Sequence, residues 1–218
     1  MDYITSRTIF CFWTGTNPIS QRRLECIEQL RRVSECNVIL VTPDTLPSYL
    51  LESAPLHAAY HHLSETHKAD YLRTYFMHHH GGGYSDIKKT TGSWISSFEA
   101  LKTSDQWCVG FQETCGGVAY EPAAHLYGEL IGNCAYIFKP RTAFTTAWYD
   151  AMLAFLDTIL DHLRQYQATF PQDRAEISGG RYPIEWNEML GRIFQRVALD
   201  YCGHFLRTLP PCIFSDYR

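Results

Sequence analysis

The stretch HKADYLRTYFMHHHGGGYSDIKKT, residues 67–90, decides how the chain is expected to fold. Apolar side chains recur in its first half at the spacing of one buried helix stripe, namely Ala69, Leu72, Tyr75 and Phe76. The glycines at 81–83 are expected to end this helix, because glycine enters left-handed backbone conformations at little cost. Residues 84–87 then read as a brief strand. We therefore expect a helix that passes directly into a short strand.

The charged residues of this stretch are the first candidates for a site. Asp70 and Arg73 are three residues apart, so they share a helix face and can pair or flank one ligand. An exposed ion pair would be worth little, but Asp70 lies in an apolar and aromatic run, where an unpaired carboxylate is costly. Asp86, at the end of the predicted strand beside bare glycine backbone, suits a sugar phosphate or a metal ion. Lys88 shares a face with Asp86 only if the chain stays extended.

Apolar runs on both sides predict the rest of the fold. The predicted strands are 8–13, 37–42, 107–111 and 133–138. The predicted helices are 20–33, capped by Ser20, then 93–101, 142–168 and 183–199. A strand, a helix and a strand within roughly 40 residues begin an α/β layer with parallel strands. We expect one α/β domain, with a central mixed but mostly parallel sheet flanked by helices.

Length and composition limit the possible classes of protein. The chain of 218 residues is long enough for one sizeable core, and its 45% hydrophobic content is that of an ordered globular protein. The net charge of -4 gives no global basic field for nucleic acid or an anionic membrane. We find no run of about 18 apolar residues that would span a membrane, and the N-terminus lacks the pattern of a secretory signal.

The eight cysteines allow a disulfide framework or free thiols. They are scattered without a CxxC pair, and several lie in apolar runs such as IFCFW and IGNCAYIF. Cysteine in such a run behaves as a small core residue. Reduced thiols in a cytoplasmic protein are therefore expected.

The central stretch resembles the core motif of GT-A-type glycosyltransferases that carry a DXD sugar-binding region. The match is to enzymes related to capsular-polysaccharide and mannosyl transferases, and is closest to virus-encoded glycosyltransferase domains. The family pattern is a small residue, Asp, two residues, Arg, a helix, Gly-Gly-x-Tyr, one residue and Asp-x-Asp. Here it reads Ala69 to Arg73 and then Gly81 to Lys88, with Lys88 in place of the second Asp.

This resemblance implies a single GT-A-like, Rossmann-like domain over 1–218. Its nucleotide-sugar half would be about 1–112 and its acceptor half about 113–218. The expected location of the protein is the cytoplasm, which would be that of the host cell if the protein is viral.

The resemblance also implies a donor site. Trp13, Thr14 and Gly15 lie at the C-terminal end of the first predicted strand, at the sheet edge where α/β proteins bind ligands. The indole of Trp13 could stack on a uracil ring, or it could simply be a core residue. Asp70 would face the nucleoside, Arg73 would steady the site, and Asp86 would meet the ribose or a metal. The implied substrate-binding residues are Trp13, Thr14, Gly15, Asp70, Arg73, Gly83, Tyr84, Ser85, Asp86 and Lys88.

A divalent cation, Mn²⁺ or Mg²⁺, would neutralise the departing diphosphate in such an enzyme. Lys88 removes one expected ligand, which leaves two hypotheses. Either Asp86 holds the metal with a later group such as Asp216 or His204, or Lys88 supplies part of the metal's charge. The working expectation is a metal. The last four residues, 215–218, could fold over the diphosphate, or they could be a frayed tail or a cut point from a longer protein.

Glu185 and Glu188 complete the candidate catalytic residues, with Asp86. The two glutamates are three apart near the start of a predicted helix, in the second segment that resembles the family, 179–194. One of them could take the proton of an acceptor hydroxyl, or both could be ordinary partners of the helix dipole. The run His78-His79-His80 resembles a zinc site, but consecutive helical residues point about 100° apart. We expect these histidines to complement the helix dipole instead.

The expected function is metal-assisted transfer of a hexose or deoxyhexose from a UDP-sugar to a glycan or glycoprotein acceptor. A GT-A fold that binds a sugar nucleotide or glycan without transferring it is the main alternative, and Lys88 is the reason to retain it. A nucleotidyltransferase would need a glycine-rich basic loop after the first strand. The corresponding sequence, TGTNPIS, has one glycine and no cation.

Overall fold

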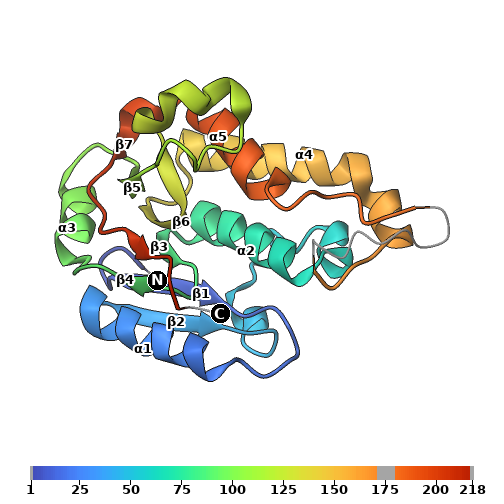
Figure 1. Cartoon of the computed structure of the whole chain (residues 1–218), viewed down its shortest axis with the longest axis horizontal. Coiled ribbons are helices and arrows are strands. Elements are labelled where there is room, and N and C mark those ends of the chain that lie inside the picture. Colours follow the sequence, from blue (N-terminus) through green and yellow to red (C-terminus); the bar gives the residue numbers. More distant parts are fainter. Residues whose placement is uncertain (1, 171–179, 217–218) are drawn as a thin grey trace.

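A six-stranded sheet organises the computed structural model, which describes residues 2–170 and 180–216 (Figure 1). The strand order is β2-β1-β3-β6-β5-β7. Strand β6 runs antiparallel to β3 and β5, and the other three pairings are parallel. The strands are β1 Thr8–Phe12, β2 Asn37–Val41, β3 Gly82–Ser85, β5 Cys108–Gln112, β6 Ile131–Phe138 and β7 Phe205–Leu206. The expected mixed, mostly parallel sheet is confirmed.

Helices cover both faces of this sheet. Strand β1 is buried throughout, so its alternating side chains enter two different cores. Ile9 and Cys11 pack with helices α1 (Gln21–Ser34) and α3 (Ile95–Thr103). Phe10 and Phe12 pack on the opposite face, with the helices α2 Glu65–His79, α4 Ala143–Gln165 and α5 Ile193–Ala198. The fold is therefore one three-layer α/β domain.

Side-chain caps mark where helices α1 and α2 begin. The Ser20 hydroxyl accepts a hydrogen bond from the Arg23 N–H, as predicted for the start of α1. Ser64 caps α2 in the same way, a cap that the sequence analysis did not assign. At its other end α2 stops before Gly81, which has a φ of 66°. The predicted passage from α2 into β3 through the glycine run is confirmed.

The order of the first three strands creates a binding crevice. Strand β1 lies between β2 and β3, so the connection from β1 to β2 and the connection from β2 to β3 run in opposite directions along the sheet. Helix α1 connects β1 to β2 on one face, and α2 connects β2 to β3 on the other. Such a reversal opens a crevice outside the carboxyl ends of the two neighbouring strands, here β1 and β3. Here these ends are Phe12 and Ser85.

A second, two-stranded sheet brings the end of the described chain back to the central motif. Strand β4 (Lys89–Thr90) pairs antiparallel with β8 (Cys212–Ile213). Figure 1 shows the red C-terminal segment reaching the green β4 across the molecule. The remaining short helices are Leu46–Tyr49, Ala58–His62, Glu121–Glu129 and Cys202–His204.

Two predicted elements differ from the structure. The helix expected from Pro183 begins only at a π-turn, Glu188–Arg192, which leads into α5. The preceding backbone is irregular because α2 holds it: the His67 Nε2–H donates to the Glu185 carbonyl. The strand expected over 84–87 ends at Ser85, because the Lys88 N–H turns back to the Asp86 carbonyl at 2.6 Å.

The structure also corrects the role expected of the three consecutive histidines. Burial lowers the pKa of His78, His79 and His80, that of His79 to about 4, so they are neutral at neutral pH rather than cationic partners of the helix dipole. His78 stacks on Tyr149, and His80 donates to the Tyr49 carbonyl. In the part of the chain that the structure describes, no group of three or more His, Cys, Asp or Glu side chains is placed to hold a metal.

All eight cysteines carry free thiols. None of the helices among the described residues is long and apolar enough to cross a membrane.

A cleft at the carboxyl ends of strands β1 and β3

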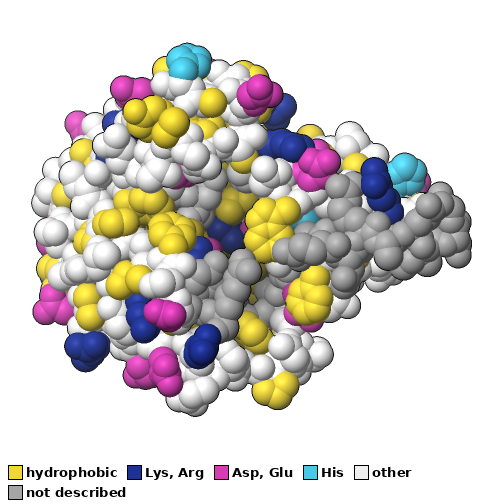
Figure 2. Space-filling model, in the orientation of Figure 1, with side chains coloured by type: hydrophobic (Ala, Val, Ile, Leu, Met, Phe, Trp, Pro, Cys, Tyr) yellow, Lys and Arg dark blue, Asp and Glu magenta, His cyan; other side chains and the backbone are white. Residues whose placement is uncertain are grey.

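A cleft of about 810 Å³ lies where the strand order predicts a binding site. Figure 2 shows the hollow in the middle of the visible face, with Lys and Arg side chains deep inside and hydrophobic side chains at its rim. Eight of the predicted substrate-binding residues line it: Trp13, Thr14, Gly15, Asp70, Arg73, Tyr84, Asp86 and Lys88. The far side of the cleft is formed by Gly117, Ala119, Asn133, Phe170, Trp186, Asn187, Leu190 and Gly191.

The loop after β1 is folded tightly against the start of α2. The Thr14 hydroxyl donates to the Glu65 carbonyl at 2.6 Å, and the Trp13 indole N–H donates to the Asn17 carbonyl at 2.8 Å. Any side chain at Gly15 would collide with the side chains of Asn17 and Glu65. Because its N–H is already engaged, Trp13 offers the cleft an aromatic face rather than a hydrogen-bond donor.

Asp70 and Arg73 form a buried ion pair at the floor of the cleft. Arg73 Nη2 lies 2.8 Å from Asp70 Oδ1, and the two residues are only 6% and 4% exposed. Burial raises the pKa of Asp70 to about 6, although Arg73 acts in the opposite direction. Arg73 also donates to the Asn133 carbonyl and lies over the Tyr84 ring, 4.5 Å from its centroid. The alternative of an exposed ion pair is therefore excluded.

Asp86 is held by hydrogen-bond donors on both of its carboxylate oxygens. The Tyr84 hydroxyl donates to Oδ1 at 2.6 Å, and Arg73 Nη1 lies 3.5 Å from the same oxygen. Lys88 Nζ lies 2.8 Å from Oδ2. Burial on its own would raise the pKa of Asp86, but Lys88 and Arg73 outweigh it and hold the pKa below its usual range. Asp86 is therefore a carboxylate at neutral pH.

Lys88 reaches Asp86 by a route that the sequence analysis did not foresee. The chain is not extended between the two residues; it turns, and the ion pair forms across the turn. Lys88 is 9% exposed, and its ammonium lies 4.7 Å from the centroid of the Phe214 ring, just beyond β8. Burial would lower the pKa of Lys88, but Asp86 raises it above its usual value. Lys88 is thus a fixed cation at the cleft.

Gly83 and Ser85 lie beneath the cleft rather than in its wall. A side chain at Gly83 would press on Ile9 and Phe98 in the core. The Ser85 hydroxyl is buried and donates to the Asp86 carbonyl at 2.8 Å. The structure therefore places these two residues as supports of the Asp86 backbone.

The two glutamates of the predicted acceptor side flank the cleft without lining it. Arg192 Nη2 lies 2.7 Å from Glu185 Oε2, and Arg192 Nη1 lies 3.9 Å from Glu188 Oε1. Glu188 also accepts a hydrogen bond from the Glu185 N–H. Because Glu185 precedes the helix, the two do not share a helix face, contrary to expectation. Trp186 and Asn187, between them, do line the cleft.

The residues around Asp86 do not fit a divalent cation. Such an ion needs several free oxygen ligands. Both oxygens of Asp86 are instead engaged by the donors Tyr84, Arg73 and Lys88, of which the last two are cations. Asp216 is exposed and is not part of the cleft wall. His204 stacks on Trp107 with ring centroids 3.8 Å apart and is likewise not part of the wall. Tyr217 and Arg218, which the sequence analysis placed over the diphosphate, lie outside the described residues.

Several site residues carried no signal in the sequence. Gln195, fully buried, accepts from the Ala119 and Tyr120 N–H groups and donates to the Gly117 carbonyl, which fixes the loop on the far side of the cleft. Three buried polar atoms near the ion pairs have no hydrogen-bond partner among the described residues: Arg73 Nε, Asn133 Oδ1 and Tyr136 Oη. Buried polar groups are rarely left unpaired in proteins, so these atoms suit a bound ligand or water.

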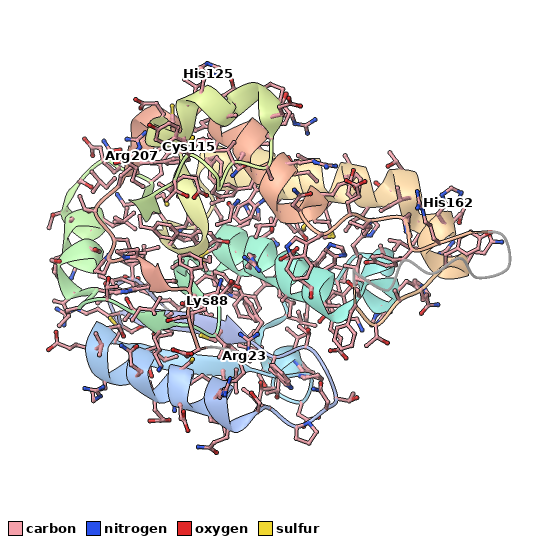
Figure 3. All side chains as sticks on the ribbon, viewed as in Figure 1. Arg23, Lys88, Cys115, His125, His162 and Arg207 are labelled. Atoms are coloured by element: carbon pink, nitrogen blue, oxygen red, sulfur yellow. The ribbon has the colours of Figure 1, made fainter. Side chains whose placement is uncertain are left out.

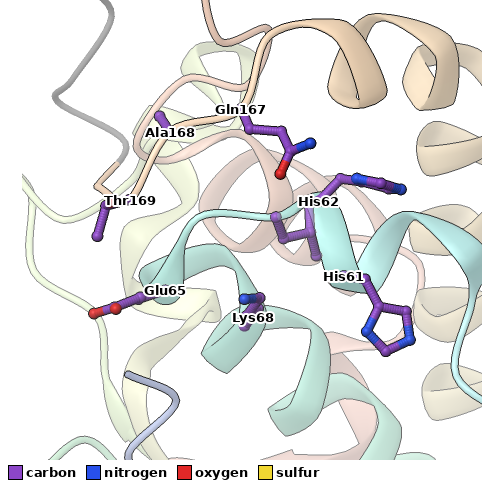
Figure 4. Close-up of a pocket in the computed structure, with 8 residues that line it drawn as sticks. His61, His62, Glu65, Lys68, Gln167, Ala168 and Thr169 are labelled. Atoms are coloured by element: carbon purple, nitrogen blue, oxygen red, sulfur yellow. The ribbon is translucent and has the colours of Figure 1, made fainter. Parts of the chain in front are cut away.

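Two further features surround the cleft. Arg23, on α1, donates to the Ile87 carbonyl at 2.9 Å and lines the cleft with Lys88; Figure 3 labels both side chains. A smaller polar hollow of about 260 Å³ adjoins the cleft at Glu65 (Figure 4). Its other lining residues are His61, His62, Leu63, Lys68, Gln167, Ala168 and Thr169.

Comparison with known proteins identifies the fold. No family model matches the chain, and no curated protein matches it in sequence. Among solved structures the chain is similar to "PaToxG Glycosyltransferase", with a TM-score of 0.51 and 11% sequence identity. The match covers 89% of this chain and 69% of that chain. At this identity the likeness shows the fold, which is GT-A-like, as the sequence resemblance implied.

Proposed function

We propose that the protein is a glycosyltransferase that moves a hexose or deoxyhexose from a UDP-sugar to a glycan or glycoprotein acceptor. The observation that carries this proposal is the buried network of Asp70, Arg73, Asp86 and Lys88 at the switch point of a GT-A-like sheet. Buried charges are costly to maintain, and this network lies in the wall of the cleft. Its volume is that of a typical small-molecule site.

The donor fits one side of the cleft. The Trp13 ring offers a stacking surface for the base, and Asp70 is placed to accept from a polar group of the nucleoside. The diphosphate would lie against Lys88 and Arg23, two of the cations that line the cleft. Fixed cations at this position would stabilise the charge that develops on the departing diphosphate. Asp86 would position Lys88 for this role.

The acceptor fits the opposite side. Trp186 is 51% exposed and Phe170 is 48% exposed, although both line the cleft. Exposed aromatic rings beside a polar cleft suit the apolar face of a sugar ring. Glu185 and Glu188 flank Trp186 and remain the candidates for the group that takes the acceptor's proton. For that role one of them would have to exchange Arg192 for the acceptor hydroxyl.

The test of this proposal is calorimetric titration of UDP against the wild type and Asp86→Ala. We expect at least a tenfold loss of affinity in the variant, because Lys88 and Arg73 lose the carboxylate that orients them. Asp161→Ala is the matched control: this carboxylate on α4 is 94% exposed, and its removal should leave binding unchanged. Unchanged or tighter binding in Asp86→Ala would contradict the role of Asp86, provided that circular dichroism shows an intact fold.

Turnover separates the transferase from its alternatives. A transferase releases UDP from a UDP-sugar, whereas a binding module of the same fold releases nothing. A nucleotidyltransferase releases pyrophosphate, but the loop after β1 is held against α2 rather than open to cradle phosphates. UDP release by the wild type, absent in Asp86→Ala, is the expected result.

A further inference from the structure

We propose that Lys88 takes the place of the divalent cation, so that this site binds the donor diphosphate without a metal. The inference rests on the proposed function, because it concerns the same donor site. It starts from the disagreement between the family pattern, which carries two carboxylates, and the residues that this chain places at the cleft.

Lys88 changes the net charge of the site relative to the family pattern, which is the first argument. Replacing the second carboxylate of the pattern by an ammonium adds two positive charges to the site, which is the charge of one divalent cation. A pair of carboxylates with a divalent cation is neutral overall, and so is the ion pair of Asp86 with Lys88. The diphosphate would therefore meet the same net charge in both arrangements.

The position of the ammonium is the second argument. The turn at 86–88 directs Lys88 back to Asp86, and Nζ lies 2.8 Å from Oδ2. The Phe214 ring packs against the ammonium from the other side, and pairing of β4 with β8 brings that ring to the site. A lysine side chain is normally flexible, so this enclosure limits its freedom before a ligand arrives. A fixed cation stabilises developing charge better than a mobile one.

The surrounding charges are the third argument. Arg73 lies 3.5 Å from Asp86 Oδ1, and Arg23 donates to the Ile87 carbonyl, between Asp86 and Lys88 in the chain. A metal ion would have to displace Lys88 from Asp86 and then remain close to two arginines. Phosphate oxygens, in contrast, are favourable partners for every one of these cations.

The first experiment measures UDP affinity by calorimetry with excess EDTA and again with Mn²⁺. We expect wild-type affinity to differ by less than twofold between the two conditions. Lys88→Met should lose at least tenfold in EDTA, and Lys88→Arg should retain most of the affinity because it keeps the charge. Lys102→Met, at an exposed lysine on α3, is the matched control and should behave as the wild type.

The second experiment restores the family pattern with Lys88→Asp. This variant should bind UDP only when Mn²⁺ is present, and electron paramagnetic resonance should detect bound Mn²⁺ that the wild type lacks. Should Lys88→Asp fail to fold, Lys88→Met and Lys88→Arg still decide the question.

The outcomes separate this inference from the proposed function. Wild-type binding that disappears in EDTA and returns with Mn²⁺ would overturn the metal-free site while supporting a donor site. Equal wild-type binding in both conditions, with no loss in Lys88→Met, would also overturn the role of Lys88. If the wild type binds UDP neither in EDTA nor with Mn²⁺, the proposed function itself is overturned.

Discussion

Tyr84 contacts one member of each of the two ion pairs of the site, Arg73 and Asp86. Its ring stacks on Phe12 and carries the Arg73 guanidinium, while its hydroxyl donates to Asp86. Burial raises the pKa of Tyr84 well above its usual value, so the hydroxyl remains a donor at any physiological pH. One side chain thus orients the cation on one side and the carboxylate on the other.

Tyr84→Phe isolates the contribution of this hydroxyl. The ring contacts with Phe12 and Arg73 remain, and only the hydrogen bond to Asp86 is lost. A hydrogen bond to a charged group is worth about 1.5–3 kcal/mol, so urea unfolding should show a loss of that order. UDP affinity should fall about tenfold, because Asp86 is less firmly placed. Tyr127→Phe, at a tyrosine that is 39% exposed, is the control. Wild-type affinity in Tyr84→Phe would argue against a positioning role.

The sequence was most informative about residues linked by local geometry. The Asp70–Arg73 pair follows from helical spacing, and Asp86 from its place at the end of a strand. The meeting of Asp86 and Lys88 was foreseen only for an extended chain, because the turn between them depends on where β3 ends. Gln195 could not be found: its role comes from a loop some 75 residues away in sequence, and nothing local marks it.

At the scale of elements, the segment from Tyr182 to Arg192 is attached to α2 by a buried polar cluster. The Tyr182 hydroxyl accepts from the Ser64 N–H and donates to His67 Nδ1, while His67 Nε2–H donates to the Glu185 carbonyl. This tautomer of His67 follows because a carbonyl can only accept. The cluster explains why the helix starts at Glu188, five residues later than Pro183 suggested. The Glu185 carbonyl accepts from His67 on α2, which holds the backbone before Glu188 outside the helix. A helix-start signal in the sequence cannot report such a tertiary contact.

Tyr182→Phe should loosen this attachment. The Ser64 N–H loses its acceptor in a buried environment, which costs about 1–3 kcal/mol. Because Trp186 and Asn187 lie in the same segment, amide hydrogen exchange over 182–192 should accelerate while exchange in β1 and β3 stays slow. Equal protection of 182–192 in variant and wild type would show that other contacts hold the segment.

At the scale of the whole molecule, the pH dependence of stability should report the buried His67. Burial lowers its pKa from 6.5 to about 4. Between these values the unfolded chain binds a proton that the folded chain does not, so the free energy of unfolding falls as the pH falls from about 6.5 to 4. The shift corresponds to roughly 3 kcal/mol. Asp70, whose pKa is raised from 3.8 to about 6, favours the folded state at low pH and opposes most of this loss. His79, whose pKa burial also lowers to about 4, adds to the loss.

Comparison with His67→Gln separates these contributions. Glutamine can still donate to the Glu185 carbonyl but does not titrate. Urea unfolding at pH 7 and pH 4 should show that the wild type loses up to about 3 kcal/mol more than the variant on acidification. His125→Gln, at an exposed histidine, should follow the wild type. Parallel pH profiles for His67→Gln and the wild type would mean that His67 takes up its proton in the folded state as readily as in the unfolded state.

The overall architecture was the most predictable level. Apolar runs located the main strands, and helical periodicity with Ser20 and Thr142 located the starts of α1 and α4. Since strands that alternate with helices form parallel sheets, the fold class followed. The antiparallel course of β6 did not follow from the sequence. The short strands β4 and β8 did not follow either, because strands of two residues have too few side chains to form a pattern.

The pairing of β4 with β8 has a consequence for shortened forms of the chain. All six strands of the large sheet precede Phe214 in the sequence, so the sheet is complete before the residue whose ring lies beside Lys88. Enclosure of Lys88 therefore depends on the pairing of β8 with β4 and not on the large sheet alone. A chain shortened before β8 would keep every strand of the large sheet but would lose both the partner of β4 and the Phe214 ring beside Lys88.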